Sequence, residues 1–216
     1  MSKKTAKDKK SRPLPKPNRQ IPISMVRQTG LIEPSQSLLH ARDYPIYGCW
    51  IMAGWQDIGI TPVVVARQPE PDKIMFGVYM VDIYCLGIKN VFTRTDYSLS
   101  RFERELPKLC SHAPEKCSVE LAHEVVYGGL EYAAKLGFEP HPDYSRQKAD
   151  LMLDPPDSHP CENNVSFGKD GKPLYISGPY DSEMKSRSVI NTLMRTCGPG
   201  DFDYIVGLGD MPDEIE

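Results

Sequence analysis

One stretch of this 216-residue chain, residues 74–84 (IMFGVYMVDIY), limits the fold more than any other. Apolar residues occupy both alternating sets of positions, so a strand formed here buries side chains on both of its faces. Its one charged residue is Asp82. The pattern therefore predicts that this is the most buried strand of a sheet.

Two further strand patterns come before it. Residues 45–55 (PIYGCWIMAGW) are apolar and aromatic, and residues 60–67 (ITPVVVAR) contain three adjacent valines. Both compositions favour extended structure. The Pro-rich stretch 68–73 is short, and a short connection between two strands predicts an antiparallel hairpin.

Helical spacing dominates the middle of the chain. The clearest helix is predicted at 118–136, where Ser118 can cap the first turn and Gly137 follows the last. Inside it, Gly128 and Gly129 indicate close approach by another strand or helix, because glycine is unfavourable within a helix. Shorter helices are predicted at 98–106, 144–153 and 181–197.

The last third of the chain mixes strands and helix. Residues 164–167 and 174–177 flank the turn 168–172 (GKDGK) and predict a second hairpin, and 202–208 predict a final strand. Runs of strands and runs of helices, without strict alternation, indicate the α+β class. We expect an antiparallel sheet of five to six strands with three to four helices packed on it.

The charge distribution suggests how the chain is divided. Residues 1–19 hold eight cations and one acid, Asp8, for a net charge of +7, so the remaining residues carry −10 of the total of −3. The cations are Lys3, Lys4, Lys7, Lys9, Lys10, Arg12, Lys16 and Arg19. We expect residues 1–40 to be a basic, Pro-containing flexible arm and transitional segment. Residues 41–216 should form one domain, with a subdomain break near 154–163.

The arm has two interpretations. Clustered lysine and arginine release counterions from a polyphosphate, which predicts sequence-blind, salt-sensitive contact with nucleic acid. The same charges could instead bind an acidic protein surface. No apolar run approaches the length of a membrane span, and the basic start lacks the apolar stretch of a secretory signal. We expect a cytoplasmic protein without a membrane partner, whose six scattered cysteines stay reduced.

Asp82 is the first candidate for chemistry. A carboxylate at the end of a buried strand is a position typical of general bases and metal ligands. Alternatively, its oxygens accept hydrogen bonds from the amides of the turn that follows.

A second candidate lies on the predicted helix 118–136. His123, Tyr127 and Glu131 recur every four residues and form one polar stripe, which could serve acid–base chemistry or ligate a metal. Tyr127 stands where a zinc peptidase would have its second histidine, so that class is excluded. The alternative is an ordinary solvated helix face, with Glu131 paired to Lys135.

The loop after this helix supplies two more candidates, His141 and Asp143. Prolines on both sides of His141 could direct it back toward His123, whereas Asp143 could simply cap the next helix. A divalent-metal hydrolase or nuclease would use Asp82, His123, Glu131, His141 and Asp143 together.

The sequence leaves several functions open. The leading hypothesis is a non-enzymatic accessory protein that needs no cofactor or metal: an acidic body contacts a protein partner or larger assembly, and the arm contacts nucleic acid or an acidic partner. The alternative is the metal-dependent hydrolase. A small-molecule binder without chemistry is a third hypothesis.

Overall fold

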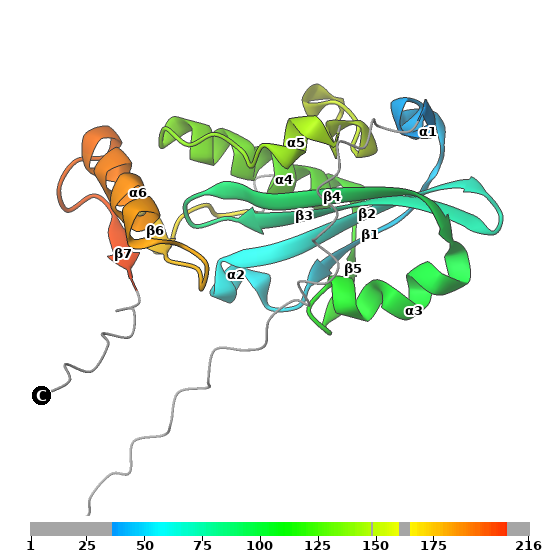
Figure 1. Cartoon of the computed structure of the whole chain (residues 1–216), viewed down its shortest axis with the longest axis horizontal. Helices are drawn as coiled ribbons and strands as arrows, with labels where there is room; N and C mark the ends of the chain where they lie inside the picture. The colour runs from blue at the N-terminus through cyan, green and yellow to red at the C-terminus, as the bar shows by residue number, and fades with distance from the viewer. Residues whose placement is uncertain (1–35, 148, 160–164, 207–216) are drawn as a thin grey trace, which may run out of the picture.

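The computed structural model describes residues 36–147, 149–159 and 165–206. Within these ranges a five-stranded sheet has the order β4-β3-β2-β1-β5, and all neighbouring strands run antiparallel (Figure 1). The strands are β1 (Ile46–Met52), β2 (Ile60–Glu70), β3 (Lys73–Asp82), β4 (Gly87–Ser98) and β5 (Pro114–Cys117). Together with the helices around it, this sheet confirms the predicted α+β class.

The described helices differ widely in length. The longer ones are α3 (Leu99–Leu109), α4 (Val119–Lys135) and α6 (Glu183–Thr196). The α-helices of one turn are α1 (Gln36–Leu39), α2 (Trp55–Ile58) and α5 (Asp143–Arg146), and 3₁₀ turns occupy Ala41–Asp43, Ala149–Met152 and Pro156–Ser158. The predicted cap of α4 is confirmed, because the Ser118 side chain accepts a hydrogen bond from the Leu121 amide.

The predicted hairpin forms the centre of the sheet. β2 runs to Glu70, beyond the predicted strand end, so that Pro71 and Asp72 alone turn the chain into β3. Val64 lies opposite Val78, and β3 is buried on both faces as predicted.

Each face of the sheet has its own apolar core, because alternate residues of a strand point to opposite sides. On one face Val63 and Val65 pack beneath α4 with Val125. On the other face Val64 packs with Phe102 of α3. Figure 1 shows α4 and α3 on opposite sides of the sheet.

Two strands, β4 and β5, were not predicted. Both lie at the edges of the sheet. β4 has few apolar residues, and the polar residues Lys89, Asn90, Thr93 and Arg94 lie between them. An edge strand can expose polar side chains, so its sequence lacks the apolar pattern of a central strand.

The predicted second hairpin is wrong. β6 (Leu174–Ile176) pairs in parallel with β7 (Asp203–Ile205), and α6 is the crossover helix between them. A parallel pair needs such a crossover, which returns the chain to the same end of the sheet. Only the turn 168–172 forms as predicted, closed by a bridge between Lys169 and Lys172. Residue 164 and residues 207–208 lie outside the described ranges.

The β6–α6–β7 unit lies beside one end of the sheet (Figure 1). A small core that includes Cys85, Leu136, Tyr175 and Leu193 joins it to the turn after β3 and to the end of α4. The Leu174 amide donates to the Tyr84 carbonyl at 3.1 Å. The predicted break near 154–163 falls partly outside the described residues, and the domain limits stay a prediction.

None of the helices in the described ranges is both long and apolar enough to cross a lipid bilayer.

Gly128 and Gly129 lie where other segments approach α4 closely, as predicted. A Cβ atom at Gly129 would lie 2.8 Å from Val81 Cγ1 of β3, and one at Gly128 would lie 2.5 Å from the Phe167 ring. The helix can pack this close to β3 only because Gly129 lacks a side chain, and Phe167 can pack against the helix only because Gly128 does.

We therefore expect Gly129→Ala to lower stability, although alanine is the better helix former. Overpacking should outweigh the propensity gain and leave a net loss of about 1–2 kcal/mol. Urea unfolding followed by circular dichroism measures it. The control, Ala134→Gly on the exposed side of α4, removes helix propensity without changing a close contact. A Gly129→Ala protein as stable as the natural chain would contradict the proposed crowding.

Candidate functional site

Asp82 closes the turn that follows β3. Its Oδ1 atom accepts hydrogen bonds from the Tyr84 amide at 2.9 Å and the Cys85 amide at 3.0 Å. Burial raises the pKa of this carboxyl, against the lowering effects of Lys89 and the turn amides. The carboxylate is therefore engaged by main-chain donors, which is the structural role that the sequence offered as an alternative.

The polar stripe on α4 is divided between two environments. His123 is buried and Tyr127 half-buried, whereas Glu131 is exposed and pairs with Lys135 at 2.8 Å. Residues 149–159 cover the first half of the helix, where the Tyr127 hydroxyl donates to the Asp154 carbonyl and His123 Nε2 lies 2.9 Å from the Pro155 carbonyl. The expectation that His123 lies on a solvated face is wrong, because a covering segment lies over it.

His141 and Asp143 interact with each other and with a neighbouring arginine. His141 Nδ1 accepts the Asp143 amide hydrogen at 3.3 Å, and Asp143 Oδ1 lies 2.8 Å from Arg146 Nη1. Pro142 takes the N-cap position of α5, so Asp143 is its first helical residue and not its cap.

Of the five residues proposed for a shared metal, only His141 and Asp143 contact each other, and Asp82, His123 and Glu131 have other partners. In the described part of the chain, no group of three or more His, Cys, Asp or Glu side chains has an arrangement that could hold a metal ion. The shared ligand sphere expected for a metal-dependent hydrolase is therefore not formed, because Asp82 and Glu131 are engaged by local partners of their own.

A charged cluster that the sequence analysis did not predict lies at the start of α4. We call it the His159 cluster, and it comprises Arg67, Glu120, His123, Asp154 and His159. His159 Nε2 lies 3.2 Å from Asp154 Oδ2, and His159 Nδ1 lies 3.8 Å from Glu120 Oε1. The His159 and His123 rings meet edge to face, with centroids 5.0 Å apart.

Arg67 of β2 is the buried cation of this cluster. Its side chain is only 3% exposed, and Nη2 donates to Asp154 Oδ1 at 2.8 Å. Its other nitrogens donate to the carbonyls of Met152, at 2.9 Å, and Tyr44, at 2.8 Å. A buried guanidinium needs partners for all of its donors, so this site holds the covering segment against β2.

The carboxylates of the cluster are stabilised in their charged form. Partial burial alone would raise the pKa of Asp154, but hydrogen bonds from His159 and Arg67 outweigh it and hold the pKa below its ordinary value. The pKa of Glu120 is also lowered, chiefly by a hydrogen bond from its own backbone amide and by the Ser118 side chain. At neutral pH Arg67 and Asp154 form an ion pair, and the geometry of the cluster fastens residues 153–159.

Sequence reasoning missed this cluster for two reasons. Arg67 is the last residue of the predicted strand 60–67 and gave no sign of a distant partner, whereas Asp154 and His159 lie in a Pro-rich loop. One usable signal was Arg67 itself, because an arginine at the end of a fully buried strand must find acceptors.

A second feature of the surface is an accumulation of exposed apolar side chains on the β6–α6–β7 unit. Of the nine large apolar residues that are exposed within the described ranges, seven belong to this unit. We call them the C-terminal apolar surface: Ile176, Tyr180, Met184, Met194, Tyr204, Ile205 and Val206. Ile176 and Ile205 are direct neighbours across the β6–β7 pair. An exposed apolar pair such as Ile176 and Ile205 is typical of a contact surface.

We expect Asp154→Asn to destabilise the protein at neutral pH, because it leaves buried Arg67 without its charged partner. The loss should be about 1–3 kcal/mol. The pKa of Asp154 is lower in the folded than in the unfolded protein, so its carboxylate stabilises the fold at pH values above the unfolded pKa. This stabilisation is lost as the pH falls through the folded pKa. The difference between the natural chain and the variant should therefore shrink below about pH 4.

Urea unfolding at pH 7, 5 and 3 tests this expectation. Asp157→Asn, which removes an exposed carboxylate from the same segment, is the matched control and should have little effect at any pH. A stability difference for Asp154→Asn that stays constant over this range would contradict the ionic role of Asp154.

Comparison of the chain with protein-family models, with curated proteins and with solved structures finds no match in any of the three. Function must therefore be inferred from the residues of this chain.

Proposed function

We propose that this chain is a non-enzymatic accessory protein whose basic arm, residues 1–19, binds nucleic acid while its acidic body contacts a protein partner. The single observation that carries the proposal is the separation of charge along the chain, with +7 in the arm and −10 in the remainder. The arm lies outside the described residues, so its support comes from the sequence.

The physical basis is counterion release. Each lysine or arginine that neutralises a phosphate frees a condensed cation, which gives affinity without reading the base sequence. A body with a charge of −10 repels the same phosphates over most of its surface. Contact should therefore be confined to the arm.

The C-terminal apolar surface supports the second half of the proposal. Monomeric proteins seldom leave many large apolar side chains exposed together, and such patches commonly contact another protein. The His159 cluster contributes differently: it fastens a surface segment through ion pairs and main-chain hydrogen bonds.

Neutralising part of the arm should weaken nucleic-acid binding. We expect the change of Lys3, Lys4, Lys7 and Lys9 to Gln to reduce the slope of log affinity against log salt by about 3 for a single strand, since each phosphate contact contributes about 0.7. Fluorescence anisotropy with a labelled single-stranded RNA, titrated at several salt concentrations, measures this slope. A duplex DNA of the same length serves as the second probe.

The matched control neutralises four exposed lysines of the body: Lys73, Lys108, Lys116 and Lys135. This variant should keep the natural salt slope although it loses the same positive charge. Equal weakening in both variants would show that net charge and not the arm governs binding. Failure of the natural chain to bind either probe would reject nucleic acid as the target of the arm and favour an acidic protein surface.

A further inference from the structure

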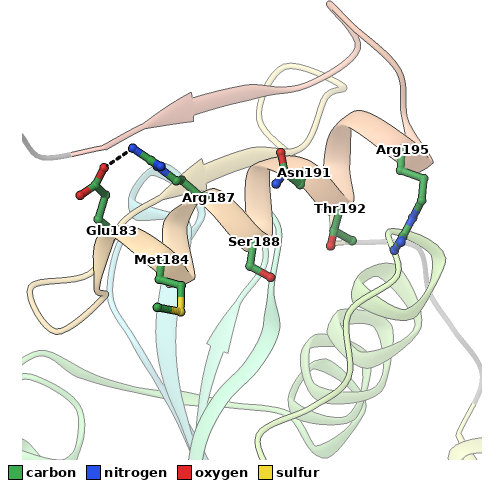
Figure 2. A pocket seen from close by; sticks show the side chains of 7 residues that line it. All are labelled: Glu183, Met184, Arg187, Ser188, Asn191, Thr192 and Arg195. Atoms are coloured by element: carbon green, nitrogen blue, oxygen red, sulfur yellow. Dashed lines mark hydrogen bonds and ion pairs between the residues drawn. The ribbon is translucent and has the colours of Figure 1, made fainter.

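The helix α6 presents an outer face that is exposed over its first two turns and that meets the end of α4 near Thr192, which would lie 3.2 Å from a Cβ atom at Gly137. Side chains of this one helix line a shallow hollow of about 590 Å³, shown in Figure 2. The lining residues are Glu183, Met184, Arg187, Ser188, Asn191, Thr192 and Arg195. We call them the α6 outer face.

This face combines positive charge with exposed apolar surface. Arg187 pairs with Glu183 at 2.5 Å, whereas Arg195 has no carboxylate partner among the described residues. Figure 2 shows Glu183 and Met184 at one end of the face and Arg195 at the other, with Ser188, Asn191 and Thr192 between them and Arg187 pointing away from Met184. Met184 is 82% exposed. A suitable occupant would therefore carry carboxylates and at least one apolar side chain.

The path of the chain brings the residues after β7 to the start of the α6 outer face. β7 is parallel to β6, and α6 runs in the opposite direction between them, so β7 ends near the first turn of α6. The Ser177 amide, just after β6, donates to the Ile205 carbonyl at 2.9 Å, so the last residue of β7 lies beside the end of β6. The described chain thus ends at Val206, beside the loop that begins α6.

The residues that follow have the required composition. Residues 207–209 (GLG) are uncharged, and residues 210–216 (DMPDEIE) carry four carboxylates together with Met211 and Ile215. They lie outside the described ranges. The seven steps between the Cα atoms of residues 206 and 213 can span up to about 25 Å when extended. The helix from Glu183 to Arg195 is about 18 Å long at 1.5 Å per residue. The acidic residues can therefore reach both arginines.

We propose that the acidic segment 210–216 docks along the α6 outer face of its own chain. Uncharged residues 207–209 pass Glu183, the carboxylate of Asp213 or Glu214 binds Arg195, and an apolar side chain of the segment covers Met184. Docking gives Arg195 a carboxylate partner and removes Met184 from solvent. This inference does not depend on nucleic-acid binding by the arm.

The test compares full-length, ¹⁵N-labelled proteins by NMR. The variants are Arg195→Glu, Arg195→Gln and a charge exchange that combines Arg195→Glu with Asp213→Lys and Glu214→Lys. Backbone heteronuclear NOE values of residues 210–216 report their order, and the Arg195 side-chain Nε–H signal reports the contact in proteins that keep the arginine. Surface ion pairs are individually weak, so we expect each single substitution to reduce the docked population roughly two- to fivefold. The charge exchange should restore the order of the segment, and high salt should remove it from the natural chain.

The matched control is Arg104→Glu, which makes the same charge change at an exposed position on α3 and should leave residues 210–216 unaffected. NOE values that are the same in the natural chain, in both Arg195 variants and in high salt would overturn the proposal. Order that disappears on tenfold dilution would mean that the segment binds a second copy of the chain, which would also overturn docking within one molecule.

Discussion

A single buried guanidinium connects three parts of this molecule that are distant in sequence. Arg67 projects from β2 and binds the carbonyl of Tyr44, just before β1, and the carbonyl of Met152, in the segment that covers α4. It also binds the carboxylate of Asp154. Removing such a cation from water is costly unless every donor finds an acceptor, so these segments can pack against β2 only in an arrangement that supplies them.

The same covering segment accounts for polar residues that looked functional in the sequence. A 3₁₀ turn and a Pro-rich loop leave carbonyl groups without regular partners, and these groups require donors when they are covered. The His123 side chain lies against the Pro155 carbonyl, and the Tyr127 hydroxyl donates to the carbonyl of Asp154. The polar side chains of His123 and Tyr127 are thus explained by the carbonyl groups that they contact, and no substrate is needed to account for them.

Elements held by contacts between residues that are close in sequence could be predicted, and elements held by distant contacts could not. The β2–β3 hairpin and α4 follow from apolar periodicity, a short turn and the Ser118 cap, all of which lie within a few residues in sequence. β4 was missed because an edge strand tolerates polar residues, and the partner of β6 was wrong because its pairing depends on a helix crossover. The His159 cluster was out of reach, since Arg67 and Asp154 are 87 positions apart.

The parallel pair of β6 and β7 has a consequence for cooperativity. Two parallel strands of three residues each cannot form before α6 has brought their ends together, and their apolar anchor is a small core that is separate from both cores of the large sheet. Loop closure must therefore come before the contacts that stabilise it. We expect this unit to exchange its amide hydrogens through sub-global opening, at a lower free energy than the hairpin at the centre of the sheet.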